Sequence, residues 1–258
     1  MLQDFPSRSD RPRSFARSRC PAYTVPPVRL PTFELPATEI TWDAVWRSDP
    51  YARPAERLKR ALKRFAHFED LLPAELSGPA LDVGCGSGQS LSLLRERYCH
   101  ARLLGIDISR QALSRAAPTA DATLLRGDIS RLPFAAETFS LVTAFGVLEH
   151  VPDQKACGAE LSRVLRRGGL LLLTTSHVFS FVNLDHLIRT RFGCYHYGYQ
   201  RNQTNQELDG MFRGLRPVRR RRVHGDPDMR VLVGLDRMLS RIGAPFSRYL
   251  YAAWEKTL

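Results

Sequence analysis

The stretch that most restricts the fold of this chain is Ala80 to Gly88, which reads Ala-Leu-Asp-Val-Gly-Cys-Gly-Ser-Gly. A short buried strand runs into a loop with glycine at every second position, and a leucine-rich helical pattern follows. Glycines carry no Cβ, so the backbone can bend sharply and a ligand can approach its N–H groups. The next helix N-terminus adds unpaired donors and a positive dipole end. The pattern predicts a polar or anionic ligand at the carboxyl end of a strand.

The spacing of the glycines narrows the kind of ligand. Gly84, Gly86 and Gly88 read G-x-G-x-G, whereas a dinucleotide site uses G-x-G-x-x-G. Asp82 stands two residues before the first glycine. This form suits a ligand with an ammonium and a carboxylate better than a pyrophosphate. A tight strand-to-helix turn without any ligand is the alternative for this motif alone.

From residue 80 onward, short apolar strands alternate with helical segments, which predicts a mostly parallel sheet covered on both faces. We expect five strands in this region, over 80–83, 102–107, 122–127, 139–145 and 169–175. We expect the helices between them over 89–98, 110–117 and 153–165, and the residues Arg167-Gly168-Gly169 read as the stop of the last one.

The C-terminal part of the chain is less regular. Thr204 with Glu207 forms a capping-box pattern, which predicts a helix over 205–212. The basic run 216–224 reads as an edge strand and 229–242 as an amphipathic helix, while 249–254 fits a strand or a helix. We expect a Rossmann-like, seven-stranded, mostly parallel α/β sheet with an N-terminal arm and a helical cap.

Asp107 ends the second expected strand. A carboxylate there is well placed to accept both hydroxyls of a ribose, and an ordinary acid before a helix is the alternative. Together with the loop at 82–88, this pattern resembles the first motifs of the class I S-adenosylmethionine (SAM)-dependent methyltransferases. The resemblance covers roughly Leu81 to Thr175 and is closest to the type-11, small-molecule branch similar to ubiquinone-biosynthesis enzymes.

The resemblance implies SAM as cofactor and S-adenosylhomocysteine as product. It implies that Asp128 accepts the adenine amino group and that Ile129 packs on the ring. Phe145 would border the methionine part. The full set of implied cofactor-binding residues is Asp82, Gly84, Cys85, Gly86, Gly88, Asp107, Ile108, Asp128, Ile129 and Phe145.

His150 is the candidate catalytic residue. The run from Phe145 to Val151 includes Glu149-His150, and the resembled family often shows Glu-His or His-His here. A histidine with a pKa near about 6.5 can act as general base toward a hydroxyl nucleophile. A packing or orienting histidine is the alternative.

Residues outside the core should bind the acceptor. The segment 177–212 is an insertion after the fifth strand, rich in aromatic, histidine and arginine residues, and a self-packed aromatic cap is the alternative. Trp42, Trp46 and Tyr51 are candidates for a lid. The candidate acceptor residues are Trp46, Tyr51, His177, Tyr195 and His196.

The expected organisation is an arm, a cap and a SAM-binding domain. Residues 1–40 are rich in Arg, Ser and Pro and predict a disordered or extended arm, with an organelle transit peptide as the alternative. Residues 41–75 form the helical cap and 76–258 the methyltransferase domain. The five cysteines lack C-x-x-C spacing, so we expect no metal site and a reducing, cytoplasmic setting.

The formal charge of +12 permits attraction to nucleic acid, anionic lipid or acidic substrates, and a coding bias toward arginine is the alternative. The basic 216–224 run beside an apolar helix is a candidate for peripheral membrane contact, and a charged edge strand is its alternative. No apolar run approaches the roughly 20 residues of a transmembrane segment.

We expect methyl transfer to oxygen or carbon of a small-molecule or lipid-linked acceptor. An RNA methyltransferase is one alternative, although the chain lacks the Asn/Asp-Pro-Pro-aromatic and Pro-Cys motifs, so nucleic acid is disfavoured. A non-catalytic partner or assembly protein that keeps the SAM fold is another. The missing G-x-G-x-x-G disfavours a nicotinamide dehydrogenase.

Overall fold

The computed structural model describes residues 38–48, 54–180, 199–224, 230–241 and 247–257. The expected arm therefore lies almost entirely outside the described residues. The same holds for Tyr51, Tyr195 and His196, three of the candidate acceptor residues.

The described chain is organised around one seven-stranded sheet, whose strand order is β3-β2-β1-β4-β5-β7-β6. Neighbouring strands from β3 to β5 are parallel, and β7 runs antiparallel to both β5 and β6. The strands are β1 (Ala80–Val83), β2 (Leu103–Asp107), β3 (Thr123–Arg126), β4 (Phe139–Phe145), β5 (Leu165–Ser176), β6 (Arg216–Val223) and β7 (Tyr249–Glu255).

The central strands form because their residues are apolar on both sides. Every residue of β1, β2 and β4 is buried, which suits parallel strands covered by helices on both faces. The expectation of a seven-stranded, mostly parallel sheet is confirmed. The segment 249–254, which fitted a strand or a helix, lies in β7 between two other strands.

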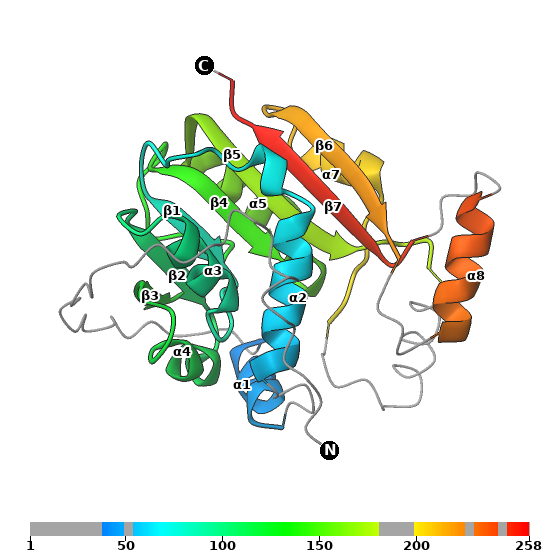
Figure 1. Ribbon diagram of the computed structural model, residues 1–258, viewed down its shortest axis with the longest axis horizontal. Helices are drawn as coiled ribbons and strands as arrows, with labels where there is room; N and C mark the ends of the chain where they lie inside the picture. Colours follow the sequence, from blue (N-terminus) through cyan, green and yellow to red (C-terminus); the bar gives the residue numbers. More distant parts are fainter. Residues whose placement is uncertain (1–37, 49–53, 181–198, 225–229, 242–246, 258) are drawn as a thin grey trace.

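Helices lie on both faces of the sheet (Figure 1). The α-helices are α1 (Thr38–Ser48), α2 (Pro54–Ala66), α3 (Gln89–Arg97), α4 (Arg110–Ala116), α5 (Gln154–Val164), α7 (Asn205–Met211) and α8 (Arg230–Arg241). The described ranges also contain the short 3-10 helices η3 (Glu69–Leu71) and η4 (Leu148–His150). The described part of the expected helical cap over 41–75 contains most of α1, then α2 and η3.

Two apolar clusters divide the core between the two faces. On one face, α2, α3 and α4 pack on the sheet through residues such as Phe65, Leu91 and Leu113. On the other face, α5 and α7 pack through Leu161 and Leu208. The alternation of strand side chains explains this division, because successive residues of a strand point to opposite faces.

The helix stop expected at Arg167-Gly168-Gly169 is wrong. Helix α5 ends at Val164 and β5 begins at the next residue, so these glycines lie inside a long strand. Gly168 has φ 68° and its N–H donates to the carbonyl of Lys256. The glycines serve an irregularity at the start of β5, where its register with β4 shifts.

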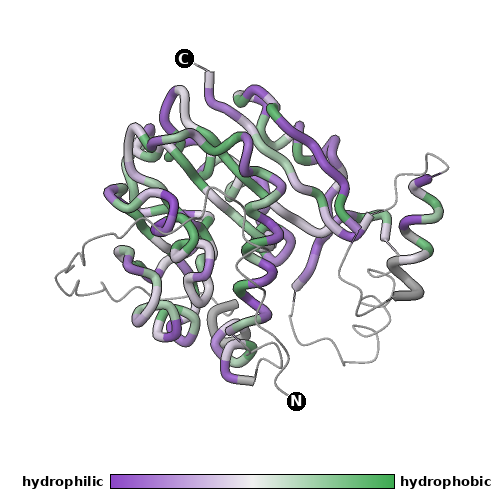
Figure 2. Tube along the Cα trace, viewed as in Figure 1, coloured by the Kyte–Doolittle hydropathy of each residue, from purple (hydrophilic) through white to green (hydrophobic). Residues whose placement is uncertain are grey.

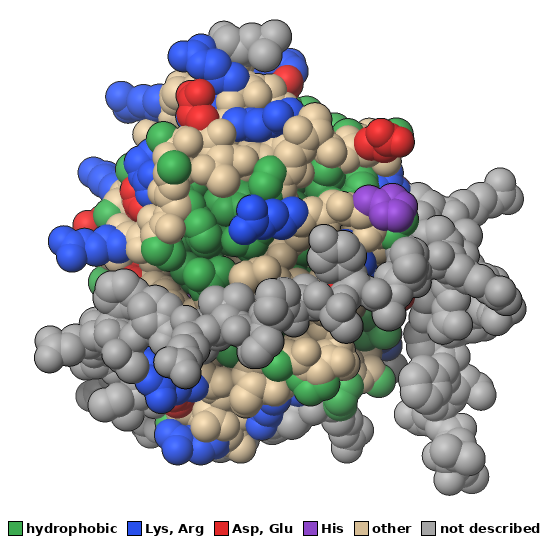
Figure 3. All heavy atoms as spheres, turned by 90° about the vertical axis from the view of Figure 1, so that its left-hand side faces the viewer, with side chains coloured by type: hydrophobic (Ala, Val, Ile, Leu, Met, Phe, Trp, Pro, Cys, Tyr) green, Lys and Arg blue, Asp and Glu red, His purple; other side chains and the backbone are tan. Residues whose placement is uncertain are grey.

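Strand β6 lies at the edge of the sheet and is strongly polar along its length (Figure 2). Three of its arginines pair with carboxylates: Arg216 with Glu255, Arg219 with Asp70 and Arg220 with Asp209. Lys and Arg side chains are also spread over the face of the molecule seen in Figure 3, rather than gathered in one patch. Within the described ranges, no helix has the length and apolar character needed to cross a bilayer.

Candidate active site

A cavity of about 310 Å³ opens at the carboxyl ends of β1, β2 and β4 and beside the loop after β3. The strand order explains the position of the cavity. The chain runs from β1 to β2 on one side of β1, and β4 later pairs with the other side of β1. Such a switch point leaves a crevice in an open parallel sheet. Helices α1 and α2 supply the opposite wall.

The glycine loop forms the floor of this cavity. Gly84 has φ 64°, and a side chain there would overlap that of Val147. A Cβ on Gly86 would lie 3.0 Å from the Trp46 ring. The loop is fixed by its neighbour strand, since the N–H groups of Gly84 and Cys85 both donate to the Ile106 carbonyl.

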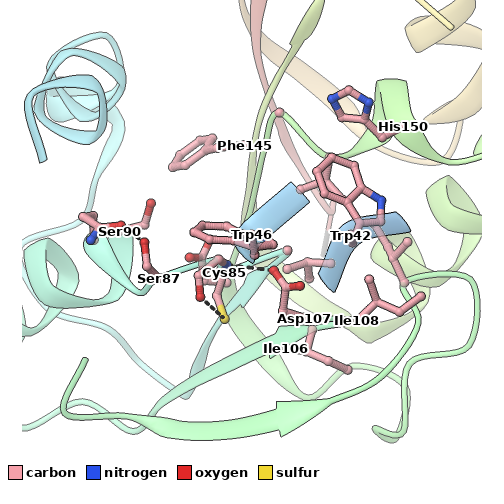
Figure 4. A pocket seen from close by; sticks show the side chains of 18 of the residues that line it. Trp42, Trp46, Cys85, Ser87, Ser90, Ile106, Asp107, Ile108, Phe145 and His150 are labelled. Atoms are coloured by element: carbon pink, nitrogen blue, oxygen red, sulfur yellow. Dashed lines mark hydrogen bonds between the residues drawn. The ribbon is translucent and has the colours of Figure 1, made fainter. Parts of the chain in front are cut away.

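Asp107 lies at the end of β2 with its carboxylate turned toward the loop (Figure 4). One oxygen accepts the Gly86 N–H at 2.8 Å and the other accepts the Ser109 N–H at 2.9 Å. Burial raises the pKa of this carboxyl to about 6, and the charge of Asp43 adds to the rise. The hydrogen bonds from the two N–H groups lower the pKa and so offset part of this effect. Each oxygen keeps lone pairs for further donors, as a ribose would supply.

Asp82 is buried inside β1 and faces the same cavity. Its carboxylate accepts the Thr143 hydroxyl at 2.6 Å. Burial raises its pKa to about 7, while the Thr143 hydrogen bond and the Arg64 charge act against the rise. A cationic group bound beside Asp82 would favour its ionised form.

The remaining expected cofactor residues are placed as follows. Cys85, Ile108, Asp128, Ile129 and Phe145 also line the cavity, and Asp128 accepts the Ser130 N–H. Gly88 does not line it. This glycine has φ 80° and its position packs against Ala116 and Ala120. Burial raises the pKa of the Cys85 thiol well above its usual range, so the thiol is neutral.

Helix α1 covers the loop with two tryptophans. Trp46 lies across the loop near Cys85 and Asp107, and Trp42 lies beside His150 (Figure 4). Asp43 fixes the helix, because it accepts the Ser109 hydroxyl and the Gln111 N–H at the start of α4. The structure thus places Trp46, one of the candidate acceptor residues, over the proposed cofactor loop.

His150 ends η4 and lines the cavity. Its ring packs edge-on against Trp42 at a centroid distance of 4.9 Å. Its Nδ1 lies 3.1 Å from the Tyr199 carbonyl, which only accepts, so Nδ1 carries the proton of that hydrogen bond. Glu149 does not line the cavity. Its buried carboxylate accepts the hydroxyls of Thr175 and Ser176.

His177 is buried and does not line this cavity. Its Nδ1 lies 3.0 Å from the Ser247 hydroxyl, and its ring packs edge-on against Phe179. The structure therefore brings together His150, Trp46 and the expected cofactor residues other than Gly88. Tyr51, Tyr195 and His196 lie outside the described residues.

Three arginines of α2 line the cavity although none of them is among the sequence-predicted site residues. Arg57, Arg60 and Arg64 all line the cavity from one face of the helix. Arg57 lies over the Trp46 ring at 5.1 Å from its centroid, and Arg115 lies 5.7 Å from the same centroid. The spacing i, i+3, i+7 marks a shared helix face, but it does not say what that face meets.

The comparisons with known proteins agree with this fold. Residues 81–173 match the family model described as a methyltransferase domain. The chain is 39% identical over 110 residues to malonyl-[acyl-carrier protein] O-methyltransferase of Herminiimonas arsenicoxydans, covering 43% of this chain and 42% of that protein. It is 32% identical over 132 residues to trans-aconitate 2-methyltransferase of Azoarcus sp., and the match covers 50% of this chain and 49% of that protein. The chain thus spans about half the length of these curated relatives.

A solved structure extends the likeness over most of the described fold. One chain of the complex between the Haloferax volcanii Trm112 methyltransferase activator and a methyltransferase aligns with a TM-score of 0.66 at 19% identity. The alignment covers 86% of this chain and 98% of that one, and at this identity it speaks for the fold alone. Residues 81–173 therefore form a methyltransferase domain, and the solved structure shows the same fold around it.

Proposed function

We propose that the protein is a SAM-dependent methyltransferase that moves a methyl group to oxygen or carbon of a small-molecule or lipid-linked acceptor. The observation that carries this proposal is the convergence of the glycine loop with Asp82, Asp107 and Asp128 on one cavity. A cavity of about 310 Å³ is within the usual range for small-molecule sites.

The residues present fit the cofactor. Val147 and the Trp46 ring lie against the Gly84 and Gly86 positions, so only glycine fits this loop without displacing them. Asp107 would accept the ribose hydroxyls and Asp128 the adenine amino group, with Ile129 as an apolar wall. Asp82 would face the methionine ammonium. Two of these carboxyls have raised pKa values, and positive groups of a ligand would offset the cost of their charge.

When bound, SAM supplies a methyl group already activated on a sulfonium. The protein's part is then to hold the acceptor in line and to exclude water, and positioning of this kind supplies most of such a rate. The tryptophans of α1 and the Phe145 ring would shield the cavity from solvent. For a hydroxyl acceptor, His150 would take the proton through Nε2, because Nδ1–H is committed to the Tyr199 carbonyl.

The direct test is calorimetric titration of the purified protein with S-adenosylhomocysteine. Wild type should bind, and Asp107→Asn should weaken binding by about tenfold or more, because a hydrogen bond to a charged group contributes about 1.5–3 kcal/mol. Glu75→Gln is the matched control, since it removes one exposed carboxylate outside the cavity.

The outcomes separate two failures. Equal binding by Asp107→Asn and wild type would show that the ribose role of Asp107 is wrong. Absence of binding by folded wild type would overturn the proposed function itself. Transfer of radiolabelled methyl from SAM to an acceptor panel then identifies the acceptor atom.

A further inference from the structure

We propose that Arg219, on the edge strand β6, is a positioning residue for the cofactor cavity and acts through Arg64 near the end of α2. The inference rests on the proposed function, because it concerns the SAM site of that cavity. Arg219 itself does not line the cavity. Its role follows from a series of hydrogen bonds that leads from β6 to the helical wall, the side of the cavity formed by α1 and α2.

The alternation of side chains along β6 turns Arg219 toward α2, because successive residues of a strand point to opposite faces of the sheet. Arg220, the next residue, pairs with Asp209 of α7 on the other face and lies over the Trp254 ring. Arg219 instead contacts the turn after α2, and Figure 1 shows this end of the helix near β7 and β6. The two neighbouring arginines therefore hold different helices.

Arg219 holds this turn by two contacts. Its Nη1 donates to the His67 carbonyl at 2.8 Å, and its fork pairs with both oxygens of the Asp70 carboxylate. The hydrogen bond from Arg219 lowers the pKa of Asp70 to about 2, so the carboxylate is ionised at neutral pH. Paired hydrogen bonds fix the plane of a guanidinium. The pairing with Asp70 thus keeps Arg219 aimed at the His67 carbonyl.

The turn connects this contact to Arg64. The His67 N–H donates to the Arg64 carbonyl at 3.1 Å, so the peptide groups on the two sides of His67 are bonded to Arg64 and to Arg219. Hydrogen bonds are directional and weaken steeply when they are bent. A rotation of the end of α2 would therefore break the Arg219 contact, and the intact contact fixes where the Arg64 side chain enters the cavity.

The position of Arg64 matters because it lies near two acids. Arg64 lines the cavity, and its charge favours the ionised form of the buried Asp82. Its Nη2 and a Glu149 carboxylate oxygen lie 3.7 and 3.9 Å from the site of a Cβ on Gly146. Hydroxyls of β5 hold the Glu149 carboxylate. A shift of α2 would change how the Arg64 charge is shared between these acids, and ionised Asp82 is the form that would bind the methionine ammonium.

Aromatic packing at the same helix end does not replace the Arg219 contact. Phe68 stacks on Phe145 and on Tyr251 at centroid distances of 5.9 and 5.8 Å, and the His67 ring packs edge-on against Tyr251 at 4.7 Å. Burial of apolar rings is favourable but non-directional, so it tolerates sliding and rotation. The rings therefore set how deeply the helix end is buried, and Arg219 sets its rotation.

The test compares Arg219→Gln with Arg220→Gln in the full chain. Each change removes a largely buried guanidinium of β6 together with an ion pair, but Arg219 meets the turn after α2 and Arg220 meets α7. Calorimetry should show that S-adenosylhomocysteine binds about fivefold or more weakly to Arg219→Gln and changes by less than about twofold in Arg220→Gln, as coupling within one hydrogen-bond network implies. Denaturant unfolding shows whether the two variants lose comparable stability.

A double-mutant cycle tests the route through Arg64. Arg64→Gln alone should weaken S-adenosylhomocysteine binding, and adding Arg219→Gln should cause less than about a further twofold loss, because the side chain through which Arg219 acts is already gone. Hydrogen exchange of the His67 amide, measured without ligand, should be faster in Arg219→Gln and unchanged in Arg220→Gln. Additive losses in the cycle, or unchanged exchange in Arg219→Gln, would overturn the inference.

A milder variant covers the case in which Arg219→Gln does not fold. Asp70→Asn removes the exposed partner of the guanidinium fork and should weaken binding by about twofold or more. Wild-type affinity in the folded Arg219→Gln variant, or an equal loss in Arg220→Gln, would overturn the inference and leave the proposed function intact. Absence of binding by folded wild type would overturn the proposed function itself, and the inference with it.

Discussion

The N–H of Gly86 donates to the carboxylate of Asp107 over 2.8 Å, which joins the glycine loop after β1 to the end of β2. The bond makes the loop and the strand-end acid one unit rather than two neighbouring motifs. A change at either residue should therefore act on both.

The first prediction concerns Gly84→Ala. A Cβ there would overlap Val147, and the residue has φ 64°, so we expect a loss of stability of about 2–4 kcal/mol from overpacking and backbone strain. Denaturant unfolding measures this. Gly214→Ala is the control, because nothing lies within 4 Å of its Cβ position. Adding Val147→Ala should recover part of the loss, and no recovery would argue against the steric explanation.

The second prediction concerns pH. Burial raises the pKa of Asp82 from 3.8 to about 7 and that of Asp107 to about 6. Between pH 4 and these values the unfolded state has lost the protons that the folded state keeps, so stability falls as pH rises. Each carboxyl contributes on the order of 1 kcal/mol per pH unit in its window.

Unfolding by guanidinium chloride from pH 4.5 to 7.5 measures this slope. Asp82→Asn should flatten it, because the amide does not titrate, and Glu75→Gln should leave it unchanged. A wild-type stability that rises over this range would contradict the assignment of these buried acids.

The third prediction concerns Asp43, which holds α1 against the start of α4. Asp43→Ala removes the acceptor for the Ser109 hydroxyl and should loosen the helix. Hydrogen exchange of the amides of 38–48 should become faster by about an order of magnitude, which corresponds to about 1.4 kcal/mol. Arg47→Ala, at an exposed position of the same helix, should have no such effect. Unchanged exchange in Asp43→Ala would mean that the tryptophan packing alone holds α1.

The fourth prediction concerns Glu149, whose carboxylate accepts the hydroxyls of Thr175 and Ser176. Glu149→Ala removes the acceptor of the buried Ser176 hydroxyl, while the Thr175 hydroxyl keeps Gln203 Oε1 as its acceptor, so the change should cost roughly 1–3 kcal/mol of stability. Glu137→Ala, at an exposed site, should cost less than about 1 kcal/mol in thermal or denaturant unfolding. If Glu149→Ala and Glu137→Ala lost the same unfolding free energy, the buried hydrogen bonds of Glu149 would not contribute more to stability than an exposed side chain does.

The strands were predictable because their apolar runs are continuous and end in recognisable motifs. Asp82 and Asp107 could be placed in one cavity because carboxyl ends of neighbouring parallel strands meet at one edge. The stop at Gly168 was misassigned because glycine permits a helix end and a turn within a strand equally well. Local sequence could not separate the two, since pairing of β5 with β7 decides between them.

The helical wall shows the limit of periodicity. The spacing of Arg57 and Arg60 places them on one face, but only the packing of Ala61 and Phe65 against the sheet fixes where that face points. In the same way, Glu149 and His150 are adjacent in sequence, yet one faces the core and the other the cavity. A 3-10 turn after β4 separates them, and no pattern in the residues indicated its orientation.

Strand β7 comes after β6 in the chain but lies between β5 and β6 in the sheet. The basic strand cannot join the sheet until 249–255 has been inserted beside β5. Loss of 249–255 would leave two strands with unpaired backbone groups, and exposed edges of this kind favour aggregation. Assembly of this half of the sheet therefore depends on a strand that is synthesised after both of its partners.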